Sequence, residues 1–486
     1  MQESSLIKIC RKLSKKEWKL FGDFMRSPYF NTYKPAIRLF EILQNEYPSF
    51  DKPKKLKKEV IYQKLYSDGS SYNKSKLHSA MFQLKKQVDA FIIQEALKEQ
   101  EQIQNQLRLF WLQNKDDHQA FELEIQEQIR KIEKKQILSA DDHKSLYSLL
   151  HQWQNHPQTQ RQKIKKDRLF RHFTHATVTK WLSLIAEFRN RSNILPETPL
   201  IDDTIVLNYI LRQNYFYSHS IRSYVLIIRM YRGELNYHEV KSQIIAHWSS
   251  MDKKVQYELW IHLLNQAGFL NRQGEIGYLA ESWELYEVGI KNDLITDNKR
   301  ISDLIYVNMI AAAAVVNKIE TAKQLSQDYK SFLKPQFRKY TVALAQAYIY
   351  FYKGKWSKDA LAFEECVKKL DSYKKNRVPI VSFTLRAHCI RLRAMYDLQY
   401  TYNQLEEDIL TQARSSFDRF LSRNKNEKLV PYRNFYNLIG RLSDLAMKNN
   451  KFSYYPQKKI RIKADIKNMD NLLFRGWLME KAEALK

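Results

Sequence analysis

The stretch that decides the predicted fold is KYTVALAQAYIYFYKGKWSKDALAFEECVKKL, residues 339–370. It predicts a helix, a tight turn at Gly354 and a second helix. The first helix, residues 342–352, is apolar on nearly every side, so we expect both of its faces to be buried. The second helix has apolar residues every three or four positions, which form one face: Trp356, Ala360, Phe363, Val367 and Leu370. This spacing predicts that Trp356 lies in the core at the junction of the two helices.

The same hairpin resembles a tetratricopeptide repeat. The residues at the motif's small, tyrosine, glycine, aromatic, phenylalanine and second small positions are Ala347, Tyr350, Gly354, Trp356, Phe363 and Cys366. Asp359 departs from the motif because it stands where a small alanine is expected, and Ala360 comes one residue late. The resemblance covers this hairpin well and its neighbours loosely. It implies a scaffold that holds a peptide or a partner protein in a concave groove.

The composition favours long helices over sheets. Only 10 glycines and 11 prolines occur among the 486 residues, whereas average usage gives roughly 34 and 24. Hydrophobic residues make up 44% of the chain, which is ample material for a core. These values predict an all-α fold.

From residue 205 onward the chain is repetitive. Turns between helices are expected near five residues: Gly233, Gly274, Asn317, Gly354 and Tyr400. Their spacing of roughly 40 residues is nearer to HEAT-type arrays than to strict tetratricopeptide arrays. For residues 201–486 we therefore predict an irregular right-handed α-solenoid of antiparallel helix pairs, with a last helix near residues 468–484 as its cap.

The first part of the chain, residues 1–94, is predicted to be a helical head. Ser14 and Glu17 have the spacing of a capping box, and Ser27-Pro28 ends the helix that follows it. Residues 95–192 are expected to form helical hairpins, either as a separate part or continuous with the solenoid. A loop with two prolines at residues 193–200 is the clearest break before residue 201.

Residues 56–91 are similar to the winged-helix heads of bacterial transcriptional activators. The similarity lies in the pattern of hydrophobic and basic residues, with short helices preceding a long basic one. It implies a DNA-binding head in front of a tetratricopeptide-like domain. The alternative is that the head is a plain helical cap for the solenoid.

The chain is strongly basic, with a formal net charge of +28. Such a field attracts polyanions, although a solvated lysine-rich surface explains the charge equally well. Two clusters form the candidate polyanion-binding set: Arg161, Lys163, Lys165, Lys166, Arg168 and Arg171, and then Lys458, Lys459, Arg461 and Lys463. Residues 459–463 alternate basic and apolar at period two, which predicts an extended segment beside Tyr454 and Tyr455.

The chain has no recognisable catalytic or metal-binding motif. His172 and His175 are three apart on a predicted helix, but their neighbours are cations, so both are interpreted as exposed residues rather than metal ligands. His143, His151 and His156 are interpreted in the same way. We therefore predict a non-enzymatic protein with no catalytic, cofactor-binding or metal-binding residues. The sequence shows no small-molecule substrate.

Three sparse cysteines, the lack of a signal peptide and the lack of a long apolar run predict a cytoplasmic protein without a membrane span. The leading hypothesis is a helical-repeat scaffold that binds a macromolecular partner, either a protein or an anionic polymer. The alternative is a nucleic-acid-binding regulator, with DNA bound by the head and a signal received by the repeats. These hypotheses differ in whether the basic residues of the head gather on one exposed helix.

Overall fold

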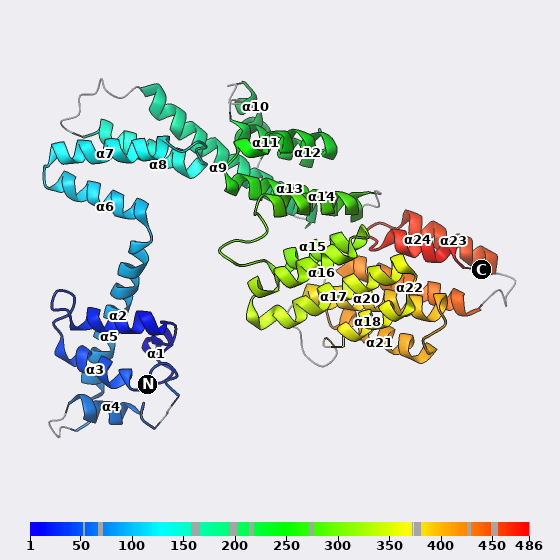
Figure 1. The fold of residues 1–486 in the computed structure, drawn as a ribbon, viewed down its shortest axis with the longest axis horizontal. Coiled ribbons are helices and arrows are strands. Elements are labelled where there is room, and N and C mark those ends of the chain that lie inside the picture. The colour runs from blue at the N-terminus through cyan, green and yellow to red at the C-terminus, as the bar shows by residue number, and fades with distance from the viewer. Residues whose placement is uncertain are drawn as a thin grey trace. The chain divides into compact units, whose positions relative to one another are not determined.

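The computed structural model describes residues 1–51, 54–66, 71–156, 166–194, 202–212, 218–272, 277–371, 373, 381–424, 429–448 and 455–485. Every regular element in these ranges is a helix (Figure 1), apart from a single β-bridge between Asp297 and Arg300. The predicted all-α fold class is therefore confirmed. The solenoid arrangement and its handedness stay predictions.

The chain divides into two compact units. The N-terminal unit comprises residues 1–134 and 149–163, and the C-terminal unit comprises residues 135–148 and 164–486. One helix, α8 (Ala140–Gln154), contributes residues to both units. The predicted boundaries of the ranges 1–94, 95–192 and 201–486 stay predictions.

The N-terminal unit begins with a helical head. The helices of the head are α1 (Ser5–Cys10), α2 (Lys15–Arg26), α3 (Lys34–Gln44), α4 (Lys58–Leu65) and α5 (Lys74–Lys98). They are followed by α6 (Glu101–Asn114) and α7 (His118–Glu133). The capping box predicted at Ser14 and Glu17 is present, and α2 ends before Ser27 as predicted. Aromatic rings fill the core of the head, where Trp18 stacks on Tyr47 with 4.7 Å between ring centroids.

The C-terminal unit contains the remaining helices around one hydrophobic core (Figure 1). They are α9 (Lys166–Ile194), α10 (Thr204–Arg212), α11 (His219–Tyr231), α12 (Tyr237–Ala246), α13 (Lys253–Arg272), α14 (Tyr278–Lys291), α15 (Asp303–Val315), α16 (Ile319–Asp328), α17 (Pro335–Ser357), α18 (Ala360–Lys369), α20 (Val381–Tyr396), α21 (Glu407–Arg423), α22 (Val430–Lys448), α23 (Tyr455–Asn468) and α24 (Arg475–Glu483). Short 3-10 helices follow α12 and α16, at Trp248–Ser250 and Lys330–Phe332. Successive helices pack in pairs, including α13 with α14, α15 with α16, and α17 with α18.

Two of the predicted turns fall where expected. Gly233 lies between α11 and α12 with φ of 74°, and Asn317 lies between α15 and α16 with φ of 63°. Both are in the left-handed region, which glycine and asparagine tolerate best. Gly274 lies outside the described residues. Tyr400 is inside the π-helix Asp397–Thr401, and the left-handed residue comes later, at Asn403.

The turn predicted at Gly354 is wrong. Helix α17 continues through Gly354 to Ser357, and the chain reverses at Lys358, where φ is 51°. Gly354 instead permits a close helix contact, because a Cβ atom there would lie 2.8 Å from the ring of Phe363 on α18. Gly354 therefore lets two helices pack closely together, and it does not reverse the direction of the chain.

The predicted burial of Trp356 is also wrong. The residue belongs to the last turn of α17, and 47% of its surface is exposed. Its indole Nε1 donates a hydrogen bond to the carbonyl of Ala314 at 3.2 Å. Because the turn comes four residues later than predicted, Trp356 belongs to α17 and does not share the face of α18 that buries Phe363.

The extended segment predicted at residues 459–463 is helical instead, within α23. Ile462 and Ile466, one turn apart, are buried, whereas Ile460 is 70% exposed. Buried residues that are four positions apart are typical of a helix. The alternation of basic and apolar residues at 459–463 was too short to predict a strand correctly. The last helix, predicted near residues 468–484, is present but shorter, since α23 ends at Asn468 and α24 spans Arg475–Glu483.

Helix α24 packs onto α20 and the segment that follows it. The indole Nε1 of Trp477 donates to Asp397 at 3.3 Å, and the ammonium of Lys481 lies 2.5 Å from the same carboxylate. Arg393, one turn before Asp397, places its guanidinium 4.3 Å from the ring centroid of Phe351 and 4.4 Å from that of Phe474. These contacts join helices that are far apart in the sequence.

Candidate functional site

Of the basic residues predicted to bind a polyanion, those that the structure describes lie on two helices of the C-terminal unit. Arg161, Lys163 and Lys165 lie outside the described residues. Lys166, Arg168 and Arg171 form the start of α9, where Lys166 and Arg171 are exposed. Their role in binding a polyanion stays a prediction.

The second predicted cluster lies on α23. Lys458 and Arg461 are exposed, and Lys463 is half-buried. Lys459 has a structural partner, because its ammonium donates to the carbonyl of Leu485 near the end of the chain. The cluster therefore contributes in part to holding the C-terminus in place, while Lys458 and Arg461 are exposed.

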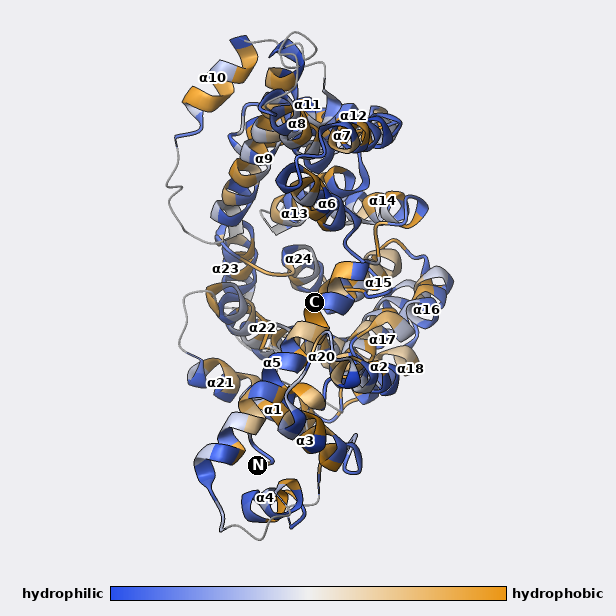
Figure 2. Ribbon diagram, turned by 90° about the vertical axis from the view of Figure 1, so that its left-hand side faces the viewer, coloured by the Kyte–Doolittle hydropathy of each residue, from blue (hydrophilic) through white to orange (hydrophobic). Residues whose placement is uncertain are grey.

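An exposed apolar surface runs along α9. It consists of Phe170, Phe173, Trp181, Leu184 and Phe188, each between 38% and 59% exposed. Together with the exposed Thr177, these residues recur every three or four positions, so they form one straight stripe of about 27 Å. We call these five hydrophobic residues the α9 stripe; in Figure 2, orange segments recur along this helix.

The opposite side of α9 belongs to the core. Val178, Leu182, Ile185 and Ala186 are buried, and the helix packs against α11 and α13. Between the two apolar faces, Ser183 donates to Glu258 of α13 at 2.8 Å. Helix α9 is thus held by one apolar face and presents a second one to solvent. Contiguous exposed apolar surface of this kind marks interaction sites.

The charges beside the α9 stripe are mostly positive. Exposed Lys166, Arg171 and Lys180 accompany it, while Arg191 pairs with Glu187 at 2.6 Å. Asp167 is the other exposed acidic residue of this helix. The flanks therefore complement a partner that carries negative charge beside an apolar surface.

Sequence reasoning missed the α9 stripe, although a signal was present. The segment after the first basic cluster is apolar on two sides of a helix rather than one. Phe170 and Trp181, like Phe173 and Leu184, are eleven residues apart, which is three helical turns. This period identifies a continuous face, but it cannot show which of the two apolar faces is buried.

The interpretation of His172 and His175 as exposed residues is wrong. Both side chains are buried, and both meet His143 of α8. The Nδ1 atoms of His143 and His172 are 2.9 Å apart, and the ring of His143 stacks on that of His175 with 3.8 Å between centroids. Ser218, the N-cap of α11, lies 2.8 Å from Nε2 of His175.

Burial, together with the repulsion from neighbouring histidines, keeps His143 and His175 neutral. Burial, followed by the charges of His175 and His172, lowers the pKa of His143 to about 3. Burial, followed by the charge of His172, lowers the pKa of His175 to about 4. Within the described part of the chain, no three or more His, Cys, Asp or Glu residues are arranged to hold a metal ion.

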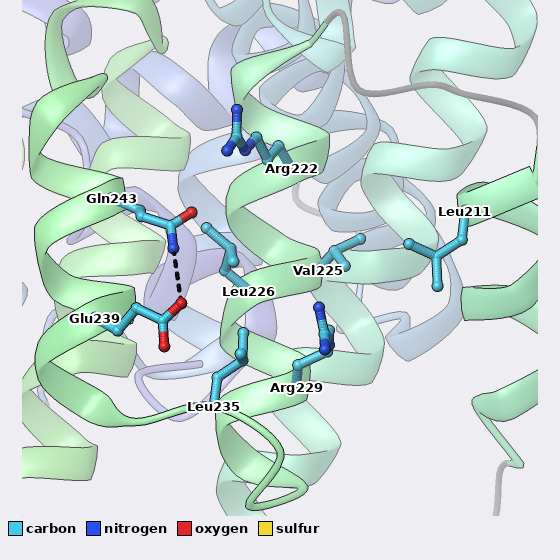
Figure 3. Close-up of a pocket in the computed structure, with 8 residues that line it drawn as sticks. All are labelled: Leu211, Arg222, Val225, Leu226, Arg229, Leu235, Glu239 and Gln243. Atoms are coloured by element: carbon cyan, nitrogen blue, oxygen red, sulfur yellow. Dashed lines mark hydrogen bonds between the residues drawn. The ribbon is translucent and has the colours of Figure 1, made fainter.

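A cavity of about 310 Å³ lies beside α11 in the C-terminal unit (Figure 3). Its lining comes from three helices and the turn between two of them: Leu211, Arg222, Val225, Leu226, Arg229, Leu235, Glu239 and Gln243. The lining combines an apolar floor with two arginines and one carboxylate.

Among the described residues of the head, the exposed basic side chains do not gather on one helix. Exposed lysines occur on α2, on α4 and at the start of α5: Lys15, Lys16, Lys19, Lys58, Lys64, Lys74 and Lys76. A helix that reads DNA concentrates its contacts on one exposed face. This distribution favours the plain helical cap, while DNA binding by the head stays a prediction.

Comparison with family models, with curated proteins and with solved structures gave no match. The resemblance to tetratricopeptide repeats therefore stays a prediction. A search of the described helices for one both long and apolar enough to cross a membrane found none.

Proposed function

We propose that this protein is a non-enzymatic helical-repeat scaffold that binds another protein through the α9 stripe. The observation that carries the proposal is the exposure of five large hydrophobic residues in one line on a helix whose other apolar face is already buried. Four of them are aromatic, namely Phe170, Phe173, Trp181 and Phe188, and aromatic residues are enriched among the anchors of protein interfaces.

The shape and charge of this face indicate the kind of partner. A straight stripe of about 27 Å matches an amphipathic helix of about five turns. Lys166, Arg171 and Lys180 beside the stripe favour a helix with acidic residues along its flanks. The proposed partner is therefore an acidic amphipathic helix of another protein.

A nucleic acid is the competing partner for the same face. Lysine and arginine neutralise phosphates, and exposed rings can stack on unpaired bases. Helix α9 carries few basic side chains along the middle of the stripe, where Lys180 is the exposed cation between Phe173 and Leu184. The observations favour the protein partner, and the experiment distinguishes the two.

The test uses the purified full chain and three defined probes. The first is a designed 20-residue amphipathic peptide with a leucine stripe and glutamate flanks, the second is its scrambled version, and the third is a 20-nucleotide oligo-dT. Binding is measured by fluorescence anisotropy at low and high salt. We expect the amphipathic peptide to bind more tightly than either other probe.

The variant Phe170→Gln/Trp181→Gln/Phe188→Gln should weaken peptide binding by at least about 30-fold, because truncating central aromatic anchors typically costs 2 kcal/mol or more. The matched control is Leu304→Gln/Leu361→Gln/Ile460→Gln, three exposed apolar residues of the same unit. Equal binding of the scrambled peptide, or equal loss in the control, would reject the proposal. Preferential oligo-dT binding that the α9 variant abolishes would assign the face to nucleic acid instead.

A further inference from the structure

We propose that the cavity bordered by α10, α11 and α12 binds a small organic anion with an apolar body, and that Arg222 is the anion's partner. This proposal is independent of the α9 stripe, because no residue of the stripe lines the cavity. It rests on the volume of the cavity, its apolar floor and the placement of its charges.

The cavity has room for a small ligand. Its volume of about 310 Å³ lies at the lower end of the range for small-molecule sites. Figure 3 shows residues of α11 at its centre, residues of the α12 side opposite them, and Leu211 of α10 on the other side. A ligand there would contact three helices and the turn that links α11 to α12.

The floor of the cavity is apolar. Val225 and Leu226 lie on the face of α11 between the two arginines, and both are buried. Leu235, just after the turn at Gly233, and Leu211 extend this surface on either side. Removing an apolar ligand body from water against these residues is favourable.

The two arginines differ in their availability. Arg229 is engaged, because its Nε donates to Glu234 at 3.0 Å. Arg222 is exposed, lies two turns away on the same helix, and has no ion-pair partner among the residues that the structure describes. An arginine fork without a carboxylate partner binds planar carboxylates through two parallel hydrogen bonds.

The lining also contains one carboxylate, Glu239, whose position relative to Arg222 decides where an anion can bind. Glu239 accepts a hydrogen bond from Gln243 at 3.2 Å on the α12 side of the cavity, and it lies nearer to the Arg229 end than to the Arg222 end (Figure 3). Arg222 also lies in the first turn of α11, after the N-cap Ser218, where the helix dipole is positive. The end of the cavity near Arg222 is therefore suited to a carboxylate.

The test is isothermal titration calorimetry on the full chain with three probes of different chemistry. Benzoate has both the carboxylate and the apolar ring, benzyl alcohol has only the ring, and inorganic phosphate has only the charge. We expect one benzoate site with a dissociation constant of about 1 mM, given the usual affinity of so small a ligand. The other two probes should bind at least about tenfold more weakly, because each satisfies only one half of the site.

Arg222→Gln should weaken benzoate binding at least about tenfold. Arg222→Lys keeps the charge without the fork and should give an intermediate loss, which also covers the case in which the glutamine variant folds poorly. Arg38→Gln is the matched control, since Arg38 is an exposed arginine on α3 of the other unit. Absence of benzoate binding, equal binding of phosphate, or unchanged binding in both Arg222 variants would overturn the proposal.

Discussion

The Nδ1 atoms of His143 and His172 lie 2.9 Å apart, so one must donate a proton and the other must accept it. An imidazolium has no acceptor nitrogen, and the pair can therefore hold at most one positive charge while this contact exists. The sequence places the two residues on different helices, α8 and α9, and the contact is one of the features that join them.

Neutral buried histidines predict that acid destabilises the protein. Burial lowers the pKa of His262 to about 4, and burial with the charge of His172 lowers that of His175 to about 4. In the unfolded chain both groups bind protons near pH 6.5, so the free energy of unfolding should fall as the pH drops from 6.5 toward 4. Between pH 7 and pH 5 we expect a loss of about 2 kcal/mol for each residue, measured by urea unfolding.

A matched pair of variants isolates this effect. His262→Gln should reduce the difference in free energy of unfolding between pH 7 and pH 5, whatever its effect on stability at pH 7. His78→Gln, at an exposed position of α5, should leave that difference unchanged. A wild-type free energy of unfolding that is the same at both pH values would contradict the prediction.

Two tryptophans should differ sharply in their contribution to stability. Trp260 on α13 is fully buried, and its Nε1 donates to the carbonyl of Leu285 at 2.7 Å. Trp260→Ala should lower the free energy of unfolding by about 3–5 kcal/mol, because it leaves a large cavity in the core. Trp356→Ala should cost only about 1 kcal/mol, since the residue is half-exposed and loses one hydrogen bond. Chemical unfolding monitored by circular dichroism gives both values, and equal losses would show that the assigned burial is wrong.

Two helical glycines should respond to alanine with opposite signs. Gly354→Ala places a Cβ atom 2.8 Å from the ring of Phe363, and forcing the helices apart should cost about 1–3 kcal/mol. Gly476→Ala in α24 meets no atom within 4 Å, so better helix propensity should add about 0.5–1 kcal/mol. Thermal unfolding of the two variants should therefore shift in opposite directions. A stabilising Gly354→Ala would mean that α17 and α18 do not approach as closely as described.

The sequence could predict features whose cause lies within a few residues. The scarcity of glycine and proline indicated the all-α fold, and the spacing of Ser14 and Glu17 indicated a helix start. The turns at Gly233 and Asn317 were predictable for the same reason, because each residue type tolerates the left-handed conformation that a helix end requires. In each case the residue type acts on the backbone at or next to its own position.

The candidate sites were much less predictable. The sequence identified basic residues at the start of α9, but it did not show that the Phe170–Phe188 side of this helix is exposed. The cavity beside Arg222 was not predicted at all, because its lining belongs to three helices whose packing brings those side chains together. Binding surfaces of this kind depend on what the neighbouring helices leave uncovered.

By itself, the sequence determined that this chain is all-α and where some of its helices begin or turn, because backbone hydrogen bonding and side-chain spacing act over one or two turns. Only the tertiary structure decided which apolar face is buried. It exposed Trp356 and Ile460, it used Gly354 for a contact with Phe363, and it gathered His143, His172 and His175 into one buried cluster. The physical reason is that burial depends on the partner helix, and that helix can lie anywhere along the chain.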